Sequence, residues 1–141
     1  MLNQPVVRTI AAIALGAIAG ALSRYYLVQG LTQMLGTHLP YGTLVVNISG
    51  CFAMGLLATL FLGPVITVHP DLRLLLLTGF LGSYTTFSSY ELDSARLLME
   101  ERFQAELIYW GGSALVGFFS LQGGMTLANW LVNQVERHWF G

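Results

Sequence analysis

The sequence contains no lysine and carries little charge of either sign. Of its 141 residues, 9% are charged and 55% are hydrophobic, whereas soluble domains are about 25% charged. A soluble core of this size would need a charged surface, and this chain has too few charged residues to build one. The composition therefore predicts an integral membrane protein.

Two further shortages narrow the functional class. The strongly basic residues are arginines only, and the formal net charge is −1, which excludes the basic surface typical of nucleic-acid binding. The single cysteine, Cys51, cannot form an internal disulfide, so cysteine usage does not indicate a redox compartment. The histidines fall in predicted loops and in the tail, and none can share a site with a serine or cysteine nucleophile. The sequence therefore predicts no enzyme.

Long apolar runs are abundant. A transmembrane helix needs about 20 mainly apolar residues, and four stretches qualify, at about 6–28, 42–68, 72–99 and 106–132. Prolines and the charged run Glu100-Glu101-Arg102 mark the connections. We therefore expect an all-α integral membrane protein with four transmembrane helices in a single domain that covers residues 1–141.

The first stretch has a second interpretation. Arg8, the apolar run after it and Ala19-Gly20-Ala21 are together typical of a signal peptide with a small-residue cleavage site. The helical pattern continues past Arg24 into Tyr25-Tyr26-Leu27, which favours a spanning helix.

The arginines divide evenly between the two sides of the membrane. Four spans put both termini on one side, together with Arg8, Arg73 and Arg137, and they put Arg24, Arg96 and Arg102 on the other. Orientation follows an imbalance of arginine and lysine, and here there is none. The count predicts dual topology, in which oppositely inserted copies pair as an antiparallel dimer. The alternative is one weakly specified orientation, fixed by the loops or by the insertion machinery.

Polar side chains in the second span share one face. Thr43, Asn47 and Cys51 are spaced four residues apart. An unpaired amide is costly at mid-span, so Asn47 must face protein or a wet cavity. The Asn47 side chain either forms a hydrogen bond between helices or acts as a hydrogen-bond donor in a pore. Near the end of the first span, Arg24 either extends to the lipid headgroups or attracts anions to a vestibule.

Small and polar residues also recur at helical spacing in the first and last spans. Gly16 and Gly20 form a small-xxx-small pattern that permits close helix packing. Tyr109, Ser113 and Gly117 form a narrow polar stripe in the last span. The stripe supplies either hydrogen bonds between helices or donors to a pore.

The most informative segment is Gly79-Phe80-Leu81-Gly82-Ser83-Tyr84-Thr85-Thr86-Phe87-Ser88-Ser89-Tyr90, in the third span. Its glycines and hydroxyls follow the purely apolar run Leu74–Leu77, which indicates a helix broken near its middle. A broken helix exposes carbonyls, which bind cations, and amides, which bind anions. Irregular backbone survives in a bilayer only beside protein or a water-filled cavity. This segment is therefore the predicted site for an ion.

At these residues the chain closely resembles the Fluc/CrcB fluoride channel family. The matching elements are the glycine-rich first span that ends in Arg24, the run Gly42-Thr43-Leu44-Val45-Val46-Asn47, the segment Gly79–Tyr90 with Glu91, and the stripe Tyr109, Ser113 and Gly117. The resemblance covers essentially the whole chain.

The resemblance implies an antiparallel, dual-topology homodimer with two fluoride pores. It also implies a central sodium ion on the dimer axis, held by backbone carbonyls that match Gly82 and Thr85 in this sequence. The first of the paired pore phenylalanines matches Phe87, and the vestibule amide matches Asn47. Tyr109 and Ser113 match polar-track positions of the fourth span.

The sequence departs from the family pattern in three places. Tyr90 replaces the second pore phenylalanine, Ser83 replaces a common glycine, and Gly117 stands where some members have serine. Tyr90 matters most, because a phenol adds a hydrogen-bonding group beside the ion path.

The polar residues are chemically suited to fluoride. Conduction requires binding that can also release, and neutral donors meet this requirement better than a fixed cation. The hydroxyls and amide that could replace water around the ion belong to Asn47, Thr86, Ser89, Tyr109 and Ser113, and electropositive ring edges could add Phe87. We expect passive fluoride exit across a bacterial plasma membrane, which would protect the cell from fluoride.

Two other functions fit parts of the sequence. A small dual-topology, proton-coupled multidrug exporter would need a carboxylate within the membrane, but the first two spans have no acidic residue, and Glu91 and Asp93 lie beyond the predicted break. A non-transporting assembly subunit would use the polar groups only to join helices.

Overall fold

The computed structural model describes residues 4–63 and 67–140, which form helices and contain no strand. The long helices are α1 (Gln4–Leu35), α2 (Tyr41–Leu62) and α6 (Phe103–Phe140). Between α2 and α6 lies an interrupted segment made of α3 (Pro70–Arg73), the π-helix η1 (Leu74–Leu81), α4 (Gly82–Tyr84) and α5 (Phe87–Met99).

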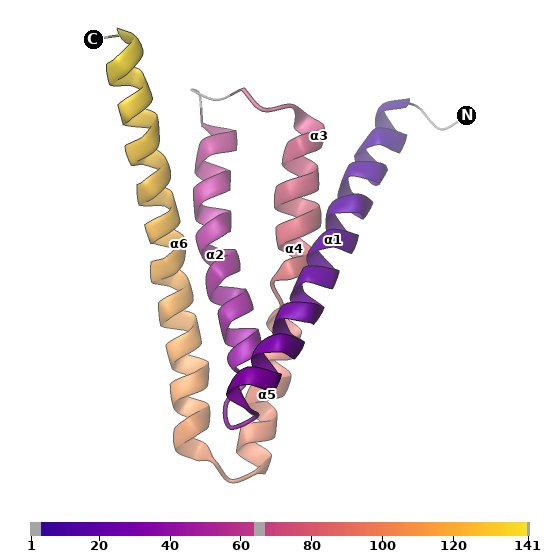
Figure 1. Ribbon diagram of the computed structural model, residues 1–141, viewed down its shortest axis with the longest axis vertical. Coiled ribbons are helices and arrows are strands. Elements are labelled where there is room, and N and C mark those ends of the chain that lie inside the picture. The colour runs from indigo at the N-terminus through magenta and orange to yellow at the C-terminus, as the bar shows by residue number, and fades with distance from the viewer. Residues whose placement is uncertain (1–3, 64–66, 141) are drawn as a thin grey trace.

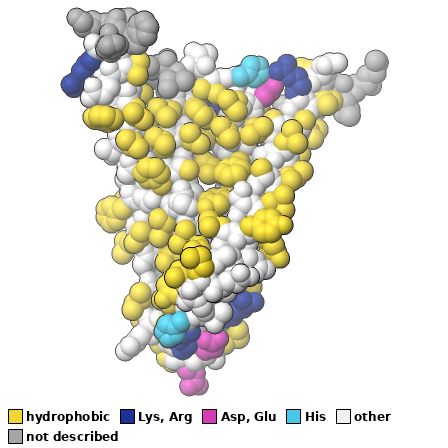
Figure 2. All heavy atoms as spheres, in the orientation of Figure 1, with side chains coloured by type: hydrophobic (Ala, Val, Ile, Leu, Met, Phe, Trp, Pro, Cys, Tyr) yellow, Lys and Arg dark blue, Asp and Glu magenta, His cyan; other side chains and the backbone are white. Residues whose placement is uncertain are grey.

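The molecule has two polar ends and an apolar middle. Figure 1 places the start of α1, the end of α2, α3 and the end of α6 at one end, and the α1–α2 and α5–α6 connections at the other. In Figure 2, charged side chains gather at these ends, and hydrophobic side chains cover most of the face between them. Among the described residues, α1, α2 and α6 are long and apolar enough to cross a membrane. The prediction of an all-α membrane protein is therefore confirmed.

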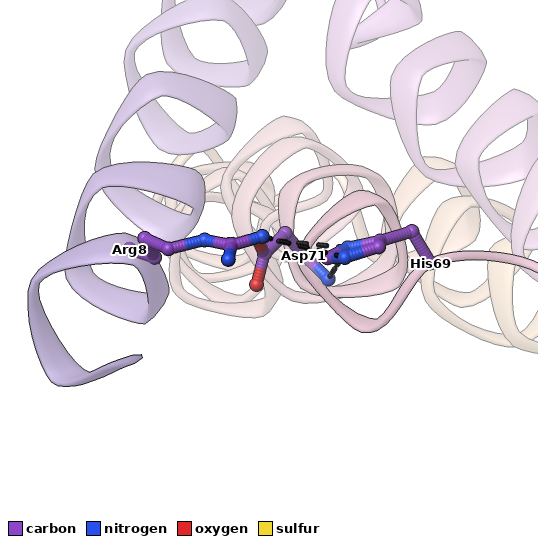
Figure 3. A network of polar contacts seen from close by, with 3 residues as sticks. All are labelled: Arg8, His69 and Asp71. Atoms are coloured by element: carbon purple, nitrogen blue, oxygen red, sulfur yellow. Dashed lines mark hydrogen bonds and ion pairs between the residues drawn. The ribbon is translucent and has the colours of Figure 1, made fainter. Parts of the chain in front are cut away.

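Polar contacts join the elements at each end. Arg8 of α1 donates to Asp71 Oδ2 of α3 from Nε at 3.0 Å and from an Nη at 2.5 Å, and the Asp71 backbone N–H donates to His69 Nδ1 at 3.2 Å (Figure 3). At the other end, Arg102 donates to the His38 carbonyl at 2.5 Å. The Arg8 pair is exposed, so it contributes at most about 1 kcal/mol.

Glycines permit close packing within two pairs of helical elements, α1 with η1 and α2 with α6. In the first pair, α1 packs on η1 so closely that a Cβ on Gly16 would lie 2.1 Å from the Leu75 carbonyl oxygen, and one on Gly20 would lie 2.2 Å from that of Phe80. In the second pair, α2 packs on α6, and a Cβ on Gly124 would lie 2.2 Å from the Phe52 carbonyl oxygen. The packing role predicted for Gly16 and Gly20 is confirmed.

The helix bounds differ from those predicted, for local reasons. The second helix ends at Leu62, short of Val68, because Gly63 is extended (φ −74°, ψ 165°). The first helix continues from Val28 to Leu35, and Gly36 then reverses the chain with a positive φ of 77°. The last helix also extends beyond both predicted ends, 106 and 132.

Candidate functional site

The helix break falls at Thr85 and Thr86, about halfway between the two ends of the molecule (Figure 1). Thr85 (φ −75°, ψ 156°) and Thr86 (φ −150°, ψ 114°) are extended, whereas Gly82–Tyr84 is still helical. The break therefore lies within the predicted segment Gly79–Tyr90, and of the two carbonyls expected to hold sodium, those of Gly82 and Thr85, only the second belongs to an extended residue.

Asn47 of α2 stabilises the extended backbone at the break. Its Oδ1 accepts from the Thr86 N–H at 2.8 Å, and its Nδ2 donates to the Thr86 carbonyl at 3.0 Å. This pair satisfies both backbone groups of Thr86, as a neighbouring β-strand would. One Nδ2 hydrogen remains for a further acceptor. Asn47 thus joins two helices and keeps a donor, so the two sequence-based interpretations of this residue are compatible.

Thr86 also begins the second half of the broken helix. Its Oγ1 accepts from the Ser89 backbone N–H at 3.2 Å, an N-cap, and donates to Ser89 Oγ at 2.9 Å. The N–H groups of Phe87 and Ser88 lie in the first turn of α5, which has no intrahelical acceptors. The start of α5 therefore presents backbone donors and the Ser89 hydroxyl at mid-molecule depth.

Gly50 of α2 leaves room for the side chain of Thr85, the first residue of the break. A Cβ on Gly50 would lie 2.2 Å from the Thr85 methyl carbon. One residue before, Ser49 Oγ lies 2.9 Å from the Tyr84 hydroxyl. Sequence analysis did not identify Gly50 or Ser49 as part of the site, although both lie within three residues of Asn47.

Three aromatic rings lie in series beside the break. Ring centroids are 5.8 Å apart between Phe87 and Tyr90, and 5.5 Å apart between Tyr90 and Tyr109. Phe87 is 74% exposed, whereas Tyr90 and Tyr109 are buried. The Tyr90 hydroxyl donates to the Trp110 carbonyl at 2.6 Å. The phenol that replaces a phenylalanine thus joins α5 to α6, and its only hydrogen is used within the chain.

The two hydroxyls of the predicted polar stripe on α6 differ in whether they have a hydrogen-bond partner. Ser113 Oγ donates to the Tyr109 carbonyl of its own helix. The Tyr109 hydroxyl is fully buried and has no hydrogen-bond partner among the described residues. Nearby, Thr43 donates to Asp93 Oδ2 at 2.7 Å. Tyr109 is therefore the member of the stripe with an unsatisfied polar atom, which is costly in a buried position.

Two hollows meet at Thr86. One, of about 520 Å³, is lined by Arg24, Thr43, Thr86, Ser89 and Asp93 among others. The other, of about 260 Å³, is lined by residues that include Asn47, Cys51, Thr86 and Phe87. Thr86 is therefore common to the linings of both hollows, and Asn47 lines the second.

The carbonyls at the break provide oxygen ligands that suit a monovalent cation. The Thr86 N–H donates to Asn47 and so is not available to the Gly82 carbonyl, its helical partner four residues earlier. The Thr85 carbonyl accepts only a long 3.4 Å contact from Arg24. Among the described residues, no three His, Cys, Asp or Glu side chains gather around a possible metal site. Gly82 and Thr85 would therefore supply backbone ligands only, and two carbonyls do not complete a coordination shell.

Most of the predicted site residues are brought together by the fold. Asn47, Thr86 and Ser89 are hydrogen-bonded, and Phe87 and Tyr109 are linked through the Tyr90 ring. Ser113 lies one turn further along α6.

A polytopic helical membrane protein with a polar site at a mid-depth helix break is the class that this fold and site define. The chain belongs to the family described as CrcB-like protein, Camphor Resistance (CrcB), whose model matches residues 11–125. The resemblance inferred from the sequence is therefore confirmed, and the protein is a multi-pass protein of the plasma membrane.

Individual relatives agree over most of their length. The Fluoride-specific ion channel FluC of Trichormus variabilis is 50% identical over 127 residues, which cover 90% of this chain and 93% of that protein. The protein of the same name from Synechococcus sp. is 49% identical, with 89% and 95% covered, and that from Synechocystis sp. is 46% identical, with 86% and 92% covered.

Proposed function

We propose that this protein is a fluoride-selective channel that lets fluoride leave the cell passively and so limits fluoride toxicity. The observation that carries the proposal is the Asn47–Thr86 pair, which stabilises extended backbone at a helix break, at a residue that lines two hollows. The relatives named Fluoride-specific ion channel FluC support the choice of ion.

The donors at the break fit a small, strongly hydrated anion. The free Nδ2 hydrogen of Asn47, the first-turn amides of α5 and the Ser89 hydroxyl can replace water around fluoride without a fixed positive charge. The positive end of the α5 dipole adds a favourable potential for an anion. The exposed ring of Phe87 can present its electropositive edge beside the same path.

Fluoride efflux from liposomes tests the proposal. Purified protein in fluoride-loaded vesicles should release fluoride and retain chloride, and Phe87→Ile should suppress the release because the ring edge is lost. Phe119→Ile is a matched control, since Phe119 is a similarly exposed ring (67%) on α6. Trapped fluoride, or equal chloride flux, would overturn the channel assignment. A response driven by a pH gradient would favour a proton-coupled exporter, and no flux at all would favour an assembly subunit.

The functional unit that we propose is an antiparallel homodimer of oppositely inserted chains. Two exposed positions lie at mid-molecule depth in the single chain: Gly82, whose carbonyl lacks its helical N–H partner, and Phe87, which directly follows the extended Thr85 and Thr86. Lipid cannot satisfy such backbone, so a protein surface must cover it, and a second copy is the simplest one. The balanced arginines permit both insertions.

We further propose that the two copies hold a sodium ion between their breaks. Antiparallel pairing would bring Gly82 and Thr85 carbonyls from both chains together, and these would double the oxygen ligands available. Replacing sodium by N-methyl-D-glucamine should then lower the thermal midpoint of the purified protein, and sodium should restore it. Equal midpoints in both buffers, with the dimer intact, would rule out this site.

A further inference from the structure

Arg96 lies between the break and the aqueous end of the chain. It is on α5, one turn before that helix ends at Met99. It lines the 520 Å³ hollow that reaches Thr86, and it also lines a second hollow of about 330 Å³ that reaches Arg102 beside the α5–α6 connection. Arg96 therefore borders both the hollow that reaches the α5–α6 connection and the hollow that reaches the break.

Arg96 differs from the other two arginines that line these hollows. Arg102 donates to the His38 carbonyl at 2.5 Å and to Glu100 at 3.3 Å. Arg24 reaches the Thr85 carbonyl at 3.4 Å. The guanidinium of Arg96 makes no hydrogen bond to the described residues.

Among the described residues, Arg96 forms one ion pair, and it is long. Its Nη1 lies 3.8 Å from Asp93 Oδ1, and its side chain is 62% exposed. Asp93 accepts a 2.7 Å hydrogen bond from Thr43 through its other oxygen, so this carboxylate is shared. The positive charge of Arg96 is therefore only partly compensated and faces the hollow.

We propose that Arg96 gathers fluoride at the mouth of the path by long-range attraction and does not bind it in the pore. The inference rests on the proposed channel function. A hydrated guanidinium concentrates anions without holding them, because clefts with low-dielectric walls focus its field. Its effect should therefore appear in the rate at which ions arrive and should disappear when salt screens the charge. The Debye length falls from about 30 Å at 0.01 M to about 3 Å at 1 M salt.

Fluoride efflux at low and high ionic strength, set with an impermeant gluconate salt, tests this role. At subsaturating fluoride and low ionic strength, Arg96→Gln should slow efflux about threefold, the effect of one unit charge about 7 Å from the ion in water. The two proteins should be equal at high ionic strength and at saturating fluoride. Arg96→Lys should behave as wild type, because it keeps the charge.

Arg137→Gln is the matched control, since it removes the same charge from an exposed residue of α6 that lines neither of these two hollows, and it should match wild type at all salt concentrations. If Arg96→Gln equals wild type at low salt, or is equally slow at both salt concentrations while it elutes as wild type, Arg96 does not act through its field. Absence of flux in the wild type would instead refute the channel function itself.

Discussion

At the scale of single residues, Asn47 shows how one side chain can act as both scaffold and donor. A polar residue at mid-span normally finds one partner on a neighbouring helix. Asn47 exchanges two hydrogen bonds with the backbone of Thr86, because an amide offers a donor and an acceptor at the spacing of a peptide group. The break is therefore defined by a residue from a different helix.

Tyr90 has a structural role in the single chain, because its hydroxyl donates to the Trp110 carbonyl of α6. Tyr90→Phe should lower the unfolding free energy by about 0.5–1.5 kcal/mol, the usual contribution of one hydrogen bond, because the Trp110 carbonyl loses its added donor. Fluoride flux should persist within a few-fold, since the ring remains beside Phe87. Chemical denaturation in detergent and liposome efflux measure the two effects.

The control for Tyr90 is another tyrosine with a more exposed ring. Tyr26 is 68% exposed, so Tyr26→Phe should change neither stability nor flux. Complete loss of flux in Tyr90→Phe, with stability unchanged, would show that the phenol touches the ion and would contradict the structural role.

At the scale of elements, two glycine-lined contacts explain how an apolar chain makes specific helix pairs. Helices in lipid gain little from apolar burial against each other, so close packing supplies much of the attraction. The α1–η1 contact is so close that the Gly16 and Gly79 backbones touch, with a Cβ on Gly79 placed 2.9 Å from the Gly16 Cα. The π-helical form of η1 lies at this contact, and only the short α4 separates it from the break; π-helical turns are frequent near functional sites.

The α2–α6 contact gives a matched test of packing. Gly124→Ala should lower the thermal midpoint by several degrees, because its Cβ would lie 2.2 Å from the Phe52 carbonyl oxygen and overpacking costs about 1–3 kcal/mol. Gly30→Ala should be neutral or stabilising, since no atom of the described residues lies within 4 Å of its Cβ and alanine favours helix by about 1 kcal/mol. A thermal scan of the solubilised protein compares them. Equal thermal midpoints would mean that α2 and α6 can move apart to accept the added Cβ without loss of stability, which would contradict the packing role of Gly124.

At the scale of the whole molecule, the chain has much apolar surface and a break that the single copy leaves partly uncovered. Phe118 and Phe119 of α6 and Phe87 of α5 are more than half exposed. Lipid can cover such rings, but it cannot satisfy the Gly82 carbonyl, which lacks its helical N–H partner. The proposed dimer accounts for both features in one assembly.

Dual topology makes a direct prediction for the whole molecule. A tag at either terminus should be labelled by an impermeant reagent from both sides of the membrane, because the arginines do not favour one orientation. Adding several lysines to the α1–α2 connection should make the labelling one-sided. Labelling of the unmodified chain from one side only would contradict dual topology.

The sequence by itself determined the class of the protein and the segment that matters. Low charge and long apolar runs require a membrane, and a glycine- and hydroxyl-rich segment inside one run indicates a break, because composition and periodicity are local properties. Asn47 could be identified as significant for the same reason, since an amide at mid-span needs a partner.

Only the tertiary structure decided the partners of these residues. It places the break at Thr85 and Thr86 within the longer predicted segment. It also shows that the Tyr90 hydroxyl donates to a carbonyl of α6 and that the Tyr109 hydroxyl has no partner among the described residues. No local pattern contains this information, because each contact joins residues from different helices or depends on how closely those helices approach. In this protein the close approach is set by glycines, which present no side chain from which a partner could be inferred.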